Sequence, residues 1–168
     1  TAARSAGGQQ LVFLGSIDGN GVRTDGRNPF HESDTPAPQS IYGRKKAAAE
    51  DCLANIAAKS GMAVTAIRTP MIYGTNAKGS FRTLSRAIAL YIPLPFGTIR
   101  NRRAFVAAEN VANFLAFRLK SPAGGMEISI VSDAEQISNA DFSRRLGRVL
   151  HTNVLLLDRR SVVEVKGG

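Results

Sequence analysis

The sequence predicts an α/β protein whose core is a parallel sheet. Residues 11–14 and 63–67 are short, mostly apolar runs of the kind that form strands buried on both faces. Between them, residues 41–59 carry apolar side chains at helical spacing, with Ser40 as a capping residue and Gly61 as the stop. A helix, a short turn and an apolar strand in succession indicate an α/β sheet.

The other elements follow from local signals. Residues 19–38 are rich in Gly, Asp, Asn and Pro, which predicts a surface loop, and loops of that length without their own structure are usually functional. The start of the chain is expected to form the helix that precedes the first strand. We further expect helices at residues 81–91, 111–120 and 141–150, the last capped by Ser138 or Asn139, a proline-broken loop at 92–97, an extended piece at 105–106 and a strand at 127–131.

Composition places the chain among globular proteins. Of its 168 residues, 43% are hydrophobic, enough for a core, and 21% are charged, too few for a disordered tail. No apolar run reaches the ~20 residues of a membrane span, and the N-terminus has no secretory apolar stretch. The single cysteine, Cys52, has no partner for an internal disulfide. We therefore expect a cytoplasmic setting, no membrane partner and no metal site.

The net charge of +9 has three explanations. It suits a nucleic-acid partner or a polyanionic small molecule, and a fragment need not keep the charge balance of its parent. No aromatic residues interleave with the basic ones as stacking platforms would require, so we expect no nucleic acid. Ala57, Gly61 and Ile67 have the spacing of a helix-turn-helix, but residues 64–67 favour a strand and Pro70 would break a recognition helix.

A tyrosine and a lysine stand four residues apart near the start of the long predicted helix. Tyr42 and Lys46 therefore share one helix face. A free phenol is a poor base at neutral pH, whereas a nearby ammonium and a helix N-terminus both stabilise its anion. Such a phenol can exchange a proton with a hydroxyl while a hydride leaves the same carbon. The same spacing also occurs in helices where the tyrosine merely packs and the lysine is solvated.

A serine supplies the context for this pair. Ser16 follows the first predicted strand, at the carboxyl end where α/β sheets place their ligands. A hydroxyl there can hydrogen-bond the reacting oxygen, although a simple turn at the end of the strand is the alternative. We expect Ser16, Tyr42 and Lys46 to converge on one small cavity.

Five segments in order resemble the extended short-chain dehydrogenase/reductase family, and within it the NAD-dependent epimerase/dehydratase group with its UDP-glucose 4-epimerase-like members. They are residues 11–16, 30–34 with 38–40, 42–46, 67–74, and 103–106 with 109–112. The resemblance covers about residues 11–150. It implies an incomplete Rossmann-like sheet with a small C-terminal substrate-binding α/β portion, and proton and hydride transfer at a hydroxyl-bearing carbon of a nucleotide sugar.

The resemblance also implies roles for single residues. Ser16 would hydrogen-bond the substrate hydroxyl, Tyr42 would be the general acid/base, and Lys46 would hold the nicotinamide ribose and tune Tyr42. Pro70 would pass close to the nicotinamide. Two positions would contact substrate, with Arg103 binding the pyrophosphate of the nucleotide sugar, which suits a guanidinium, and with Ser80 nearby.

The chain departs from the family's pattern at five positions. Gly15 stands where a second Ser or Thr is usual, and Lys45 stands where Ser precedes the motif lysine. Met71 replaces a common Asn, Thr75 a Pro, and Ala107 a frequent His. Because these changes touch the expected site, a non-catalytic scaffold of the same fold is the alternative to an enzyme.

No G-x-x-G-x-x-G or G-x-G-x-x-G motif, the turn that would bind the cofactor's phosphates at a helix N-terminus, follows a predicted strand. We expect residues 1–75 to be the C-terminal half of a cofactor-binding domain and residues 76–168 the substrate-binding portion, interleaved in one compact unit. NAD is the expected cofactor, with NADP not excluded, and its binding without the N-terminal half should be weak. Exposed strand edges predict a homo-oligomer.

Overall fold

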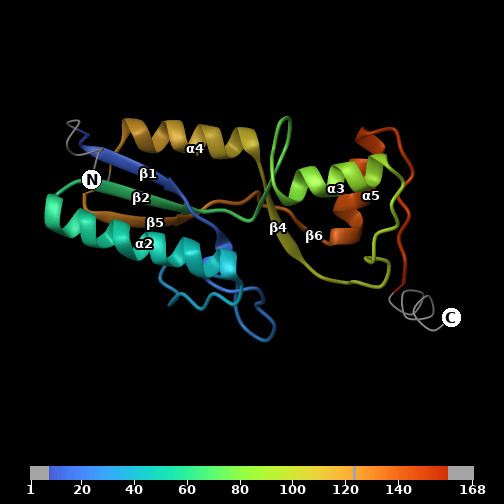
Figure 1. The fold of residues 1–168 in the computed structure, drawn as a ribbon, viewed down its shortest axis with the longest axis horizontal. Helices are drawn as coiled ribbons and strands as arrows, with labels where there is room; N and C mark the ends of the chain where they lie inside the picture. The colour runs from blue at the N-terminus through green and yellow to red at the C-terminus, as the bar shows by residue number, and fades with distance from the viewer. Residues whose placement is uncertain (1–7, 123, 159–168) are drawn as a thin grey trace. The chain divides into compact units, whose positions relative to one another are not determined.

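The computed structural model describes residues 8–122 and 124–158 (Figure 1). The helix expected at the start of the chain falls largely on residues 1–7, outside the described part. Two compact units emerge from the chain's own contacts: the first comprises Thr1–Pro70 and Val106–Ser132, the second Met71–Phe105 and Asp133–Gly168. The assignment of residues 1–75 to a cofactor half and of 76–168 to a substrate portion stays a prediction.

A three-stranded parallel sheet forms the centre of the first unit. Its order is β1 (Gln10–Leu14), β2 (Ala63–Arg68), β5 (Met126–Ile130), with Leu11 opposite Val64 in the register. The central strand β2 is almost wholly buried, because it has a neighbour on each edge. The predicted α/β class and the parallel pairing are confirmed.

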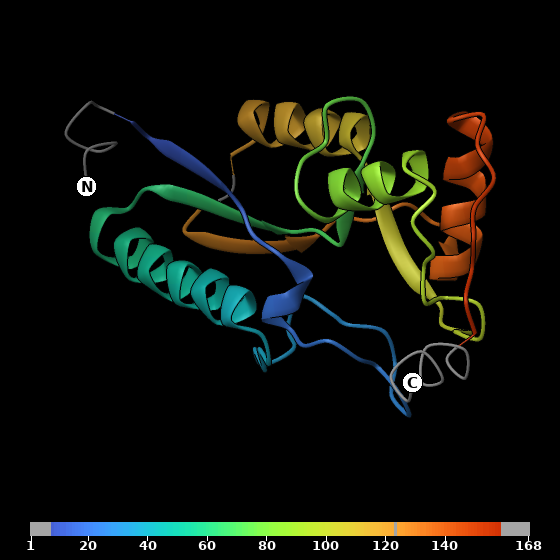
Figure 2. The ribbon, with the colours of Figure 1, turned by 45° about the vertical axis from the view of Figure 1, so that its right-hand side comes forward.

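Helices cover both faces of this sheet. α2 (Ile41–Ser60) and α4 (Ala108–Lys120) lie on opposite sides of it in both views (Figures 1 and 2). The Ser40 hydroxyl caps α2 by accepting a hydrogen bond from the backbone N–H of Gly43 at 2.8 Å, and Gly61 ends the helix in the left-handed conformation at φ 67°. Both predicted signals are confirmed. The core between α2 and the sheet consists of Ala57, Met62 and Val64, with Leu11, Leu53, Ile56 and Met126 packed against it.

The second unit is built on a smaller sheet. Its strands are β3 (Met71–Tyr73), β4 (Arg103–Ala107, whose last two residues belong to the first unit) and β6 (Gln136–Ile137), in the order β3-β4-β6, with β4 and β6 antiparallel. The helices α3 (Ser80–Ala89) and α5 (Asn139–Val149) pack against each other. Ser138 caps α5, as predicted, through a 3.0 Å bond from the Asp141 N–H to its hydroxyl.

The structure excludes one alternative and adds two short strands. The helix-turn-helix alternative is wrong, since Ala63–Arg68 is a buried strand and not a recognition helix. The short strands β3 and β6 were not predicted, because three and two residues carry no readable alternation. Among the described residues no helix is long and apolar enough to span a membrane.

Candidate active site

Ser16 lies where the chain leaves β1. It caps a short 3-10 turn, Ile17–Gly19, and its hydroxyl accepts a 3.3 Å hydrogen bond from the Asp18 N–H. The neighbouring Ile17 N–H donates to the Thr69 carbonyl at 3.0 Å, which ties this turn to the end of β2. Ser16 is buried, with 9% of its surface exposed to solvent. The serine therefore sits at the carboxyl end of two parallel strands, where α/β sheets bind ligands.

Gly43 brings the start of α2 against this turn. A Cβ at Gly43 would lie 2.5 Å from the carbonyl oxygen of Asp18, a distance that real side chains do not adopt. Only glycine allows the helix backbone to come so close. The glycine directly after Tyr42 thus places the helix carrying Tyr42 and Lys46 against the turn that begins at Ser16.

Tyr42 and Lys46 are neighbours on α2. The Lys46 Nζ lies 5.7 Å from the centre of the Tyr42 ring and 4.9 Å from that of Phe13. It also donates a 2.8 Å hydrogen bond to the carbonyl of Leu14, the last residue of β1. The Tyr42 ring is 55% exposed, so it is available to a ligand. The ammonium is therefore anchored at the strand end, with its charge beside the phenol.

The other predicted site residues divide between the units. Pro70 follows Thr69 and closes the first segment of the first unit, next to the bond that holds Ile17. Ser80, the first residue of α3, and Arg103, the first residue of β4, are both exposed and belong to the second unit. Ser16, Tyr42, Lys46 and Pro70 thus come from elements that meet at one end of the first unit's sheet.

A buried ionic cluster behind the Ser16 turn was not predicted. Arg68 donates from Nε and Nη2 to one oxygen of Glu50, at 2.9 and 2.6 Å, and from Nη1 to the Asn20 side-chain oxygen at 3.0 Å. All three side chains are nearly inaccessible to solvent. The cluster joins β2, α2 and the end of the 3-10 turn. The available signal was the arginine that directly follows the apolar run 63–67, because an arginine buried there requires a partner.

This cluster accounts for the glycine at position 15. The second carboxylate oxygen of Glu50, Oε1, is buried without a hydrogen-bond partner among the described residues. A Cβ at Gly15 would lie 2.7 Å from that oxygen and 3.2 Å from the carbonyl of Ile67. A side chain at this position would displace the carboxylate, so glycine here follows from the placement of Glu50.

The long loop before α2 is held by carboxylates. The Glu32 carboxylate accepts a 3.1 Å bond from the Ile130 N–H, and this backbone bond lowers the pKa of Glu32 below its usual value. The pKa of Asp34 is lowered in the same way, first by the His31 N–H and then by Arg27. The loop is therefore ordered beside the end of β5.

The residues of the candidate site can be compared with what a dinucleotide cofactor or a metal ion needs for binding. Lys46 uses one of its three N–H donors on Leu14, which leaves two for the hydroxyls of a ribose. In the described part of the chain, no strand is followed by the G-x-x-G-x-x-G or G-x-G-x-x-G turn that binds a dinucleotide's phosphates at a helix N-terminus. These residues thus fit the nicotinamide end of the cofactor and not its phosphate end. No group of three potential metal ligands occurs in the described ranges.

Comparison with known proteins identifies the class. Residues 1–131 match the model of the NAD dependent epimerase/dehydratase family, and the chain belongs to that family. It is 34% identical over 149 residues to a UDP-glucose 4-epimerase from Vibrio cholerae, an alignment that covers 88% of this chain and 45% of the relative. The chain spans less than half the length of the curated relatives it matches.

Solved structures share the fold. The UDP-glucose 4-epimerase of Thermus thermophilus in complex with NAD superposes with a TM-score of 0.76 at 21% identity, covering 93% of this chain and 53% of that one. MoeE5 in complex with UDP-glucose and NAD gives a TM-score of 0.79 at 22% identity, covering 94% of this chain and 53% of that one. At this identity the likeness establishes the Rossmann-like α/β architecture.

Proposed function

We propose that this chain carries the reaction centre of an NAD-dependent epimerase or dehydratase that acts on a nucleotide sugar. The observation that carries the proposal is the placement of Lys46, whose ammonium is fixed at the end of β1 beside the exposed Tyr42 ring. Family membership and the nucleotide-sugar complexes of structural neighbours support it.

Three residues would perform the proton transfer. Tyr42 takes the proton of a sugar hydroxyl through its phenolate oxygen, which the Lys46 ammonium stabilises. Ser16 hydrogen-bonds the same hydroxyl and orients it. Bound NAD supplies the acceptor for the hydride that leaves the hydroxyl-bearing carbon. Epimerisation, dehydration and oxidation all begin with this step.

The binding roles rest on charge and position. Arg103 is an exposed guanidinium, a group that pairs with two phosphate oxygens at once. Ser80, at the first turn of α3, would contact the same substrate, and Pro70 would border the nicotinamide. We expect the chain alone to bind NAD weakly, because the described residues supply ribose contacts but no phosphate-binding turn. Micromolar binding of NAD by the chain in isothermal titration would contradict this.

Replacing Tyr42 tests the proposal directly. The chain is joined to the N-terminal half of a relative, and interconversion of UDP-glucose and UDP-galactose is followed. Tyr42→Phe should lower the rate by about 10²- to 10⁴-fold, the usual contribution of a general acid/base. Tyr91→Phe, which removes another exposed tyrosine hydroxyl, should leave the rate unchanged. Equal rates in wild type and Tyr42→Phe would refute the assignment.

A non-catalytic scaffold is the second candidate. The departures at Met71 and Ala107, where the family's usual polar residues are missing, favour it. Under this alternative neither wild type nor Tyr42→Phe turns over nucleotide sugar, although both fold. The two variants therefore discriminate between the candidates in one assay.

A further inference from the structure

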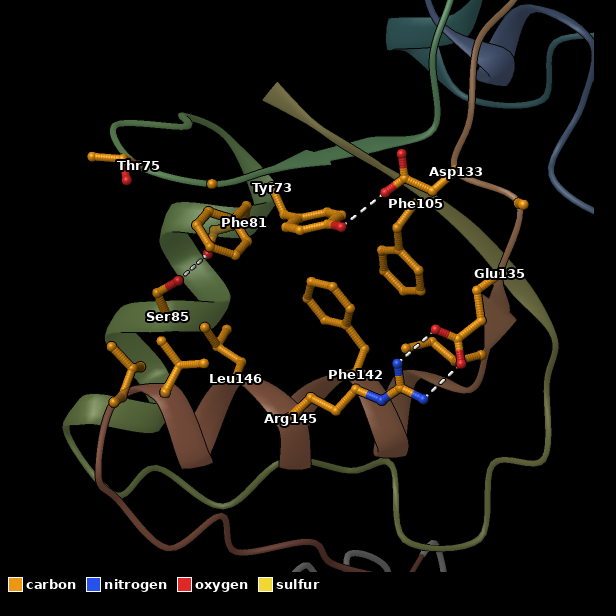
Figure 3. Close-up of a pocket in the computed structure, with 15 residues that line it drawn as sticks. Tyr73, Thr75, Phe81, Ser85, Phe105, Asp133, Glu135, Phe142, Arg145 and Leu146 are labelled. Atoms are coloured by element: carbon orange, nitrogen blue, oxygen red, sulfur yellow. Dashed lines mark hydrogen bonds and ion pairs between the residues drawn. The ribbon is translucent and has the colours of Figure 1, made fainter. Parts of the chain in front are cut away.

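The second unit contains a cavity that the proposed reaction centre does not use (Figure 3). Its volume is about 770 Å³, within the range of roughly 300–1,000 Å³ typical of small-molecule sites. Side chains from α3, α5 and the small sheet line it. Every lining residue belongs to the second unit, so the cavity is complete within that unit.

Aromatic rings form its floor. Phe105 and Phe142 are stacked with their centres 4.0 Å apart, and Tyr73 meets Phe142 edge-on at 5.6 Å. The centre of the Phe81 ring lies 6.4 Å from the ring centres of both Tyr73 and Phe142. Figure 3 shows the four rings gathered around one space. Phe105 and Phe142 are buried, so the floor is a fixed apolar surface.

The charged side chains at the cavity wall already bond to one another. The Tyr73 hydroxyl donates to Asp133 at 2.8 Å, and this bond raises the pKa of Tyr73, which keeps the phenol protonated. Arg145 makes two 2.7 Å bonds to Glu135. An apolar guest leaves these pairs intact and packs against the aromatic rings of the floor. The lining therefore favours a guest without hydrogen-bonding groups of its own.

The rim continues this apolar surface to solvent. Val149 and Leu150 line the cavity at the end of α5 and are both exposed, Val149 to 74%. Leu90 and Ile92, just beyond α3, are further exposed apolar residues of the same unit. A flexible hydrocarbon chain can extend from the aromatic floor to these exposed residues, whereas a compact ring compound would contact only the floor.

The second unit carries more cationic than anionic side chains. The segment from Met71 to Phe105 has no carboxylate side chain. Apart from Arg103, which the proposed function assigns to the nucleotide sugar, it carries the cations Lys78, Arg82, Arg86, Arg100 and Arg102. Arg148 directly precedes Val149 at the rim, while the carboxylates Asp133 and Glu135 line the wall and are bonded to Tyr73 and Arg145. An anionic head group outside the cavity complements this surface.

We propose that this cavity binds the hydrocarbon chain of a single-chain amphiphile with an anionic head group, such as an alkyl or prenyl phosphate. The site is separate from Ser16, Tyr42 and Lys46, so it stands whether or not the proposed function does. A soluble amphiphile and a membrane lipid both have a hydrocarbon chain and can both have an anionic head group. The expected ligand is the soluble amphiphile with a single chain.

The test is isothermal titration of the full chain with octyl, decyl and dodecyl phosphate below their micelle concentrations. Each added methylene should tighten binding by about three- to fourfold until the cavity is full. Dodecyl phosphate should bind more tightly than neutral dodecyl maltoside, and salt should reduce the difference. Affinity that is independent of chain length, or binding of inorganic phosphate as tight as that of dodecyl phosphate, would overturn the proposal.

A pair of matched variants locates the site. Val149→Asp places a carboxylate at the rim of the cavity and should weaken dodecyl phosphate binding at least tenfold. Val22→Asp makes the same change at an exposed valine of the first unit and should have no effect. Circular dichroism is the control that each variant folds. Leu150→Ser is a second rim variant that repeats the test without adding a charge. Equal affinities in all variants, or binding only to phosphatidylglycerol vesicles, would reject a cavity site.

Discussion

At the scale of single residues, two glycines set the geometry of the candidate centre. Gly43 lets α2 approach the Asp18 carbonyl, and Gly15 leaves room for the carboxylate of Glu50. Tyr42 and Lys46 could be paired from the sequence because their spacing is local. The need for glycine at positions 15 and 43 could not be predicted from the sequence. It depends on Glu50, which is distant in sequence from Gly15, and on the path of the turn at Asp18, which approaches Gly43.

Substitution of Gly43 is the prediction at this scale. Gly43→Ala should lower the free energy of unfolding by about 1–3 kcal/mol, because the new methyl group collides with a backbone oxygen. Gly19→Ala is the control, since a Cβ there meets nothing within 4 Å. Urea denaturation measures both. Equal stabilities for the two variants would show that α2 does not contact the turn as described.

At the scale of elements, the cluster of Arg68, Glu50 and Asn20 fastens β2, α2 and the Ser16 turn together. Long patterned elements were predictable: β1, β2 and α2 lie within a few residues of their expected bounds. The ionic cluster was not predictable, because Glu50 stands among the apolar residues of α2 and its partner Arg68 lies on β2. The two-residue and three-residue strands likewise depend on their neighbours for their existence.

Removing one member of the buried pair should be costly. Arg68→Met leaves the Glu50 carboxylate buried and unpaired, which should lower the free energy of unfolding by about 3–5 kcal/mol. The double variant Arg68→Met/Glu50→Leu should recover most of that loss. Arg144→Met removes an exposed pair with Asp141 and should cost less than about 1 kcal/mol. Thermal unfolding that shows no recovery in the double variant would contradict this account.

Glu32 gives the loop a pH dependence. Its folded pKa is lowered by the Ile130 N–H, so its contribution to stability is present above the unfolded value of about 4.3 and is lost as pH falls through the folded value. Wild type should therefore exceed Glu32→Gln in stability at pH 7, and the gap should shrink below pH 4. Denaturation curves at both pH values measure this. A gap that is constant with pH would mean that the charge of Glu32 is not involved.

At the scale of the whole molecule, the sheet of the first unit has two edge strands, β1 and β5. Among the described strands β1 pairs only with β2, and its residues Leu11 to Leu14 are apolar. Unpaired apolar edges promote association. We therefore predict a homo-oligomer, which light scattering across a concentration series would detect. A Leu14→Lys variant, at an exposed residue of this strand, should shift the distribution towards monomer, and a monodisperse monomer for wild type would contradict the prediction.

The convergence of Ser16, Tyr42 and Lys46 on one hydroxyl is tested most directly by a crystal structure of the chain, joined to the N-terminal half of a relative, with NAD and UDP-glucose bound. The account predicts that the Ser16 and Tyr42 oxygens both lie about 2.6–3.2 Å from the same sugar hydroxyl, with Lys46 on the nicotinamide ribose. A sugar bound with neither oxygen within reach of a common hydroxyl would contradict it.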